Sequence, residues 1–74
     1  MRNNIKKLRE KYNLTQKQLA EKVNVSRQAI NAVETGKFDP SIWLAFDIAA
    51  FFGLPIEEVF DFQKRKETNN QIPL

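Results

Sequence analysis

Residues 14–36 read LTQKQLAEKVNVSRQAINAVETG, and the spacing of the apolar residues in this stretch decides the fold. Apolar residues recur three and four positions apart on both sides of Asn24 and Val25, which predicts two short amphipathic helices. A connection this short forces the two helices to cross steeply. The small side chain of Ala20 suits a close crossing, and Asn24 tolerates the positive φ that a tight corner needs. The stretch therefore predicts a helix-turn-helix.

The ends of these two helices carry their own signals. Thr15 and Gln18 have the spacing of a capping box, and Ser26 is a favourable N-cap. Gly36 stands where glycine commonly ends a helix. We expect helices over about residues 15–23 and 26–35. The residues expected to face the core are Leu19, Ala20 and Val23 in the first helix, and Ala29, Ile30 and Val33 in the second.

Helical periodicity continues on both sides of this stretch, and no segment alternates as a strand does. It predicts three more helices, over about residues 4–12, 41–52 and 56–60. The first is expected to bury Ile5, Leu8 and Tyr12. For the second we prefer Ser41 over Asp39 as the N-cap. We therefore expect an all-α, five-helix domain over residues 1–63, followed by a polar, flexible tail over residues 64–74.

The composition argues against catalysis. The chain has 74 residues and contains neither cysteine nor histidine, which removes thiolate and imidazole metal ligands and the commonest general base. It also has no glycine-rich phosphate loop. We expect one domain that is not an enzyme and uses no metal and no cofactor. The longest apolar run, residues 48–52, is too short for a membrane span, and no signal peptide is visible, so we expect a cytoplasmic protein.

Charge is distributed unevenly along the chain. Residues 1–37 hold nine Lys and Arg against three Asp and Glu, whereas residues 38–63 hold five Asp and Glu and no basic residue. A basic first half indicates that one face of the protein meets a polyanion.

The helix-turn-helix stretch resembles the Xre family of regulators, the Cro/repressor type with a lambda-repressor-like fold. The resemblance rests on the pattern Leu14-Thr15-Gln16-x-x-Leu19-Ala20-x-x-Val23, then Val25-Ser26-x-x-x-Ile30-x-x-Val33-Glu34-x-Gly36. It continues to Phe60 and covers about residues 4–62. It implies a transcriptional regulator, expected to be a repressor, whose third helix enters the major groove of double-stranded DNA.

The residues that would meet DNA follow from this placement. Arginine can grip guanine, glutamine and asparagine can pair with adenine, and alanine can touch a thymine methyl group. We expect base contacts from the outward-facing residues of the third helix, Arg27, Gln28, Asn31 and Ala32. We expect phosphate contacts from Gln16, Lys17, Ser26, Lys37 and the backbone N–H groups around Phe38.

The resemblance also implies two structural roles. Gln16 is expected to brace the start of the third helix as well as bond a phosphate. Arg9 and Glu34 are expected to form an ion pair that ties the first helix to the end of the third and orients it.

The fourth predicted helix departs from the family pattern, because it has apolar residues on a second side. Trp43, Phe46 and Ala50 lie three and seven positions apart. We expect these residues, with Phe62, to form a homodimer interface on a palindromic operator. The alternative is that the large side chains fold over a small core. With no sensor domain visible, we expect no small-molecule effector.

Two other functions stay open from the sequence. The chain could be the antitoxin of a toxin–antitoxin pair, with residues 64–74 binding the toxin. It could also be a protein-interaction module that does not bind DNA, although the basic first half and the polar third helix argue against that.

Overall fold

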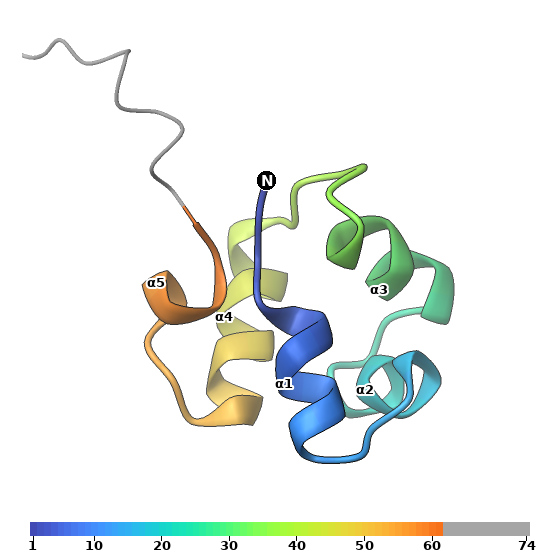
Figure 1. Ribbon diagram of the computed structural model, residues 1–74. Helices are drawn as coiled ribbons and strands as arrows, with labels where there is room; N and C mark the ends of the chain where they lie inside the picture. Colours follow the sequence, from blue (N-terminus) through green and yellow to red (C-terminus); the bar gives the residue numbers. More distant parts are fainter. Residues whose placement is uncertain (62–74) are drawn as a thin grey trace, which may run out of the picture.

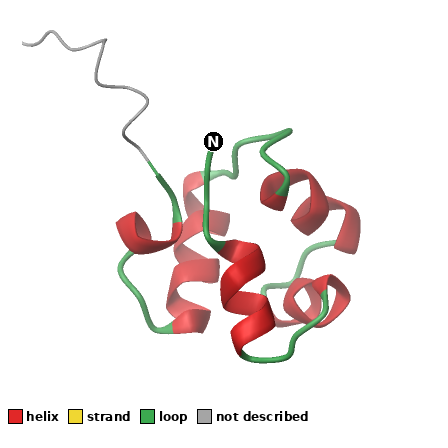
Figure 2. Ribbon diagram, in the orientation of Figure 1, coloured by secondary structure: helices red, strands yellow, loops and turns green. Residues whose placement is uncertain are grey.

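The computed structural model describes residues 1–61, which form five α-helices (Figure 1). The helices are α1 (Ile5–Lys11), α2 (Gln16–Lys22), α3 (Arg27–Glu34), α4 (Ile42–Phe52) and α5 (Ile56–Val59). Within this part of the chain loops join the helices and no strand is drawn (Figure 2), so the predicted all-α, five-helix fold is confirmed. Phe62, the predicted domain end at residue 63 and the predicted tail lie outside the described residues.

Three helices begin at the predicted N-caps. The Thr15 hydroxyl accepts a hydrogen bond from the Gln18 N–H at 3.0 Å, and the Gln18 side-chain oxygen accepts one from the Thr15 N–H at 2.8 Å. The hydroxyls of Ser26 and Ser41 each accept from the N–H three residues further on, at 3.0 and 3.1 Å. Each hydroxyl thus satisfies an N–H that has no partner inside its helix.

The connections depend on residues that adopt left-handed backbone conformations. Asn13 has φ of 57° after α1, and Asn24 has φ of 62° at the corner between α2 and α3. Asparagine adopts this region more readily than other non-glycine residues. Gly36 after α3 has φ of 81°. An added Cβ there would come no closer than 3.5 Å to another residue, so the conformation and not a lack of space calls for glycine.

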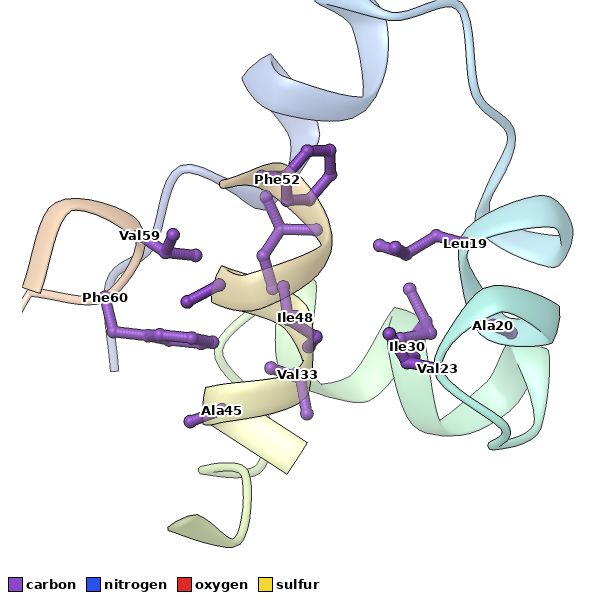
Figure 3. Close-up of a cluster of buried hydrophobic side chains, with 12 residues drawn as sticks. Leu19, Ala20, Val23, Ile30, Val33, Ala45, Ile48, Phe52, Val59 and Phe60 are labelled. Carbon is purple, nitrogen blue, oxygen red and sulfur yellow. The ribbon is translucent and has the colours of Figure 1, made fainter. Parts of the chain in front are cut away.

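The core is formed by side chains from every helix. Figure 3 shows that the buried side chains of α4 lie between those of α5 and those of α2 and α3. Leu19, Ile30 and Ile48 have no exposed surface. The full set of buried residues is Ile5, Leu19, Ala20, Val23, Ile30, Val33, Ala45, Ile48, Ala49, Phe52, Val59 and Phe60.

The segment before α1 has a role that the sequence did not reveal. The Asn4 N–H donates to the Val59 carbonyl at 2.8 Å, and Asn3 forms an isolated antiparallel bridge with Phe60. The Asn3 side-chain amide also donates to the Val33 carbonyl at 2.9 Å. This segment therefore connects the end of α3 with α5, which are distant in sequence.

The predicted burial of Tyr12 is wrong, because 52% of its surface is exposed. Tyr12 is the C-cap of α1, where the helix ends before its side chain can enter the core. Its ring instead stacks on Phe52 at the edge of the core, with ring centroids 5.9 Å apart. Leu8 and Ala29 are half-buried and not fully buried as predicted.

The large side chains of α4 do not fold over the core. Trp43 is 76% exposed and Phe46 49% exposed, and Ala50 is exposed as well. Ile42 at the start of α4 is 54% exposed. These four residues are named the α4 patch below. None of the helices in residues 1–61 is long and apolar enough to cross a membrane.

Substitution of Ile48 tests the core. We expect Ile48→Ala to lower the free energy of unfolding by about 2–5 kcal/mol, because the side chain is fully buried and a cavity would remain. The matched control is Asp47→Ala at an exposed position of the same helix, with an expected change of about 0.5 kcal/mol or less. Urea denaturation followed by circular dichroism measures both. Equal losses for the two variants would contradict the observed placement of α4.

Candidate nucleic-acid interface

The outward face of α3 is polar and uncovered. Arg27, Gln28 and Asn31 are exposed, and their spacing of three and four residues places them on one side of the helix. Ile30 and Val33 lie on the opposite, buried side. Ala32 is half-buried, so it offers less surface than the other three predicted base-contact residues offer.

A two-bond ion pair holds α3 to α1. The Arg9 Nε donates to Glu34 Oε1 at 3.0 Å, and Arg9 Nη2 donates to Glu34 Oε2 at 2.7 Å. A third donor, Arg9 Nη1, bonds the Leu14 carbonyl at 2.8 Å. The side chains are only 12% and 6% exposed, so water competes weakly for either group. The structure thus brings together the two residues that the family resemblance implies as a pair.

The surroundings keep this pair charged. Burial by itself raises the pKa of the Glu34 carboxyl. Hydrogen bonds from Arg9 and Gln16 and the positive charges of Arg9 and Lys6 outweigh burial, so the pKa of Glu34 lies below its usual value. The hydrogen bond to Glu34 is the main reason that the pKa of Arg9 is raised.

Gln16, the first residue of α2, extends this arrangement. Its side-chain Nε2 donates to Asn31 Oδ1 at 3.0 Å and to Glu34 Oε1 at 3.3 Å. The predicted brace between α2 and α3 therefore exists, but these bonds reach the middle and the end of α3 and not its start. The start of α2 therefore lies beside the second half of α3.

The predicted phosphate contacts divide into two groups. Lys17, Ser26 and Lys37 are exposed around α2 and α3. The backbone N–H groups of Lys37 and Phe38, however, both donate to the Ala32 carbonyl, at 2.9 and 3.1 Å. Because the turn after α3 already uses these groups, we no longer expect them to bind phosphate. Lys37 then offers its ammonium group, while the Phe38 side chain is 64% exposed and apolar.

The arrangement favours a polyanionic ligand that also presents hydrogen-bonding groups. The nine basic residues of positions 1–37 fall in α1, α2, α3 and their flanking segments, and no basic residue lies in positions 38–61. The part of the chain that the structure describes holds no group of three acidic side chains that could bind a metal ion.

Comparison with known proteins agrees with this geometry. Residues 5–59 match the model of the helix-turn-helix family. The chain is 54% identical to an uncharacterized HTH-type transcriptional regulator of Methanocaldococcus jannaschii, over 85% of this chain and 96% of that protein. It is 44% identical to another of Archaeoglobus fulgidus, over 89% and 93%. It is also 44% identical to the HTH-type transcriptional activator BcrR of Enterococcus faecalis, over 74% of this chain but 27% of that protein.

The ion pair predicts a pH dependence of stability. Since the native pKa of Glu34 is lowered, its contribution is present above the unfolded-state pKa of about 4.3 and is lost as pH falls through the native pKa. At neutral pH we expect Glu34→Gln to be about 1.5–3 kcal/mol less stable than the wild type.

Urea unfolding of both proteins between neutral and acidic pH measures this difference, and comparison with the variant cancels the contributions of the other carboxylates. The gap between the two proteins should narrow as the solution is acidified. A gap that stays constant or widens would contradict the role assigned to the Glu34 charge.

Proposed function

The chain belongs to the helix-turn-helix family, and we propose that it regulates transcription by binding double-stranded DNA with α3 in the major groove. The observation that carries this proposal is the polar, uncovered face of a helix whose other face is buried. The names of its relatives are those of transcription regulators and not of enzymes. These relatives come from archaea and bacteria, so we place its action in the cytoplasm, where their DNA lies.

The chemistry of α3 supports base reading. The major groove admits an α-helix, and arginine and glutamine are suited to bidentate bonds with guanine and adenine. Arg27 and Gln28 occupy the first turn of α3, and we assign them to base contacts together with Asn31 and the less exposed Ala32. Lys17, Ser26, the Lys37 side chain and the backbone N–H of Gln16 at the start of α2 then contact the phosphates on either side of the groove.

We propose that the protein represses transcription and does not activate it. Repression requires only that the bound protein occupy the site where the transcription machinery would bind, and a small domain with a reading helix is sufficient for this. This chain matches only 27% of the length of the relative that is named an activator. A shared helix-turn-helix therefore does not transfer activation to this chain.

The α4 patch supports a homodimer. Trp43, Phe46 and Ala50 recur on one side of α4 and are exposed in the single chain, as is Ile42. An exposed apolar patch on a small soluble domain marks a contact surface. Two copies related by a two-fold axis would present two α3 helices about 34 Å apart to a palindromic operator.

Base reading is tested with Arg27→Ala. We expect its affinity for the preferred DNA fragment to fall about 5- to 150-fold, because a bidentate base contact is worth about 1–3 kcal/mol. Fluorescence anisotropy measures binding to genomic fragments, including the region upstream of the protein's own gene, at several salt concentrations. Wild-type affinity should fall as salt rises.

The control is Arg2→Ala, which removes the same charge before α1. We expect this variant to lower the affinity for preferred and unrelated fragments by the same factor. If Arg27→Ala also weakened both fragments equally, Arg27 would not be reading a base.

The dimer is tested by sedimentation equilibrium without DNA. We expect the wild type to dimerise and Trp43→Lys to be monomeric, because a lysine charge at the centre of an apolar contact is costly to bury. Tyr12→Lys, the same kind of change at an exposed aromatic outside α4, should leave the dimer intact, with circular dichroism checking the fold of each variant. A wild type that stays monomeric at its highest soluble concentration would refute the dimer.

A further inference from the structure

The exposed face of α4 carries one charge among apolar side chains. Asp47 is exposed and is the only charged residue of α4. Trp43, Ala50 and Phe51 lie three or four positions from it, and all three are exposed. Residues at this spacing are neighbours on the surface of a helix. The Asp47 carboxylate therefore lies within the apolar surface that we assign to the dimer.

The elements beside α4 add further negative charge. α5, which packs on α4, carries Glu57 and Glu58, and the segment before α4 carries Asp39. No basic residue lies in positions 38–61. Within residues 1–61, the structure shows no hydrogen bond or ion pair of the Asp47 side chain. In the single chain the charge of Asp47 is therefore stabilised by water.

One basic residue of α1 approaches α4, but on another side of the helix. The Lys11 ammonium lies 5.5 Å from the centre of the Tyr12 ring, and that ring stacks on Phe52. Phe52 is buried and follows Asp47 by five positions, which is about 140° around a helix. Lys11 is therefore held away from the exposed face of α4.

A second copy of the chain is the occupant that this face fits. Positions 38–61 hold five acidic residues, so this half of the molecule repels DNA and anionic lipid headgroups. The apolar side chains of the α4 patch are instead matched by the same side chains of another copy. Such a contact also brings two acidic surfaces together, and that repulsion has to be relieved.

The symmetry of the dimer determines what Asp47 meets. In a two-fold contact both copies use the same patch, so a residue at its centre lies opposite its own counterpart. α4 runs from Ile42 to Phe52, and Asp47 is its middle residue. Packing of α4 on α4 in opposite directions, which also opposes the two helix dipoles, therefore brings the two Asp47 carboxylates together.

We propose that the two Asp47 carboxylates meet across the dimer axis and share a proton, so that acid tightens the dimer. Two carboxylates in one site do not both stay ionised, because their repulsion and the loss of water favour protonation of one. The dimer thus binds one proton more than two separate chains bind, and acid shifts the equilibrium towards it. The protein can then respond to acidity without a ligand-binding domain. This inference rests on the homodimer of the proposed function.

The test is sedimentation equilibrium of the full chain without DNA, between about pH 8 and about pH 5, where Glu34 stays ionised. We expect the wild-type dissociation constant to fall with decreasing pH, by at most about tenfold per pH unit, because one proton is bound per dimer. Asp47→Asn keeps the shape and removes both charges. We expect its dimer to be about tenfold or more tighter at neutral pH and to depend little on pH. The control, Glu21→Gln at an exposed position of α2, should behave as the wild type.

A charge-reversed variant tests whether the two Asp47 residues meet each other. Asp47→Lys sets two like charges against each other, so we expect it to dimerise weakly by itself. Mixed with the wild type, it sets a lysine against an aspartate, and we expect mixed dimers to exceed the statistical half of all dimers. Native mass spectrometry of the mixture measures this proportion, and circular dichroism checks that each variant is folded. A proportion of half or less would show that the two residues do not meet.

The outcomes separate this inference from the homodimer on which it rests. A dimer that weakens in acid, or that Asp47→Asn weakens at neutral pH, has its carboxylate paired with a basic group, which overturns the shared proton. A wild-type dimer whose affinity does not change with pH overturns it as well. In each of these cases the homodimer stands. Wild type and Asp47→Asn that are both monomeric at every pH overturn the homodimer and this inference together.

Discussion

The contact between Arg9 and Glu34 is the interaction on which the DNA-facing surface depends. α3 has eight residues, too few for a helix to be stable in water by itself, so its shape and direction come from what it packs against. Ile30 and Val33 anchor it to the core, but apolar packing is not directional. The ion pair adds two bonds of fixed geometry between residues 25 positions apart. A buried pair of this kind adds little net stability, yet it strongly penalises any arrangement of α3 that separates its members.

The same carboxylate also links the core of the domain to the face that would read DNA. The Glu34 carboxylate accepts hydrogen bonds from Arg9 of α1 and Gln16 of α2, and Gln16 also donates a hydrogen bond to Asn31. All three helices of the first half thus converge on one negative charge. The α4 patch lies on a different helix and joins no part of this network, which is consistent with separate surfaces for DNA and for a second copy.

Sequence reasoning succeeded where the determinants are local. The capping box at Thr15 and Gln18, the positive φ of Asn24 and the buried side of α3 all follow from residue type and spacing within a few positions. The resemblance to a family implied the ion pair between Arg9 and Glu34, which the spacing of residues along the chain could not have predicted.

The rest depends on contacts between distant segments. Periodicity places Tyr12 on the inner side of α1, but the helix ends there and the ring lies at the edge of the core. Asn3 donates a hydrogen bond to the end of α3, but it lies in a segment without hydrophobic periodicity. The sequence pattern therefore did not predict this contact. That Gln16 reaches Asn31 follows from the crossing angle of two helices, which the sequence restricts but does not specify.

The most direct test of this account is a double-mutant cycle on the ion pair, read as the free energy of unfolding at a temperature where all four proteins are folded. The proteins are the wild type, Arg9→Met, Glu34→Met and the double variant. We expect each single change to cost about 1.5–3 kcal/mol, because it leaves a partly buried charge without its main partner, and the double change to cost clearly less than the sum of the two. Costs that simply add would show that the two side chains act independently and that the pair does not hold α3 in place.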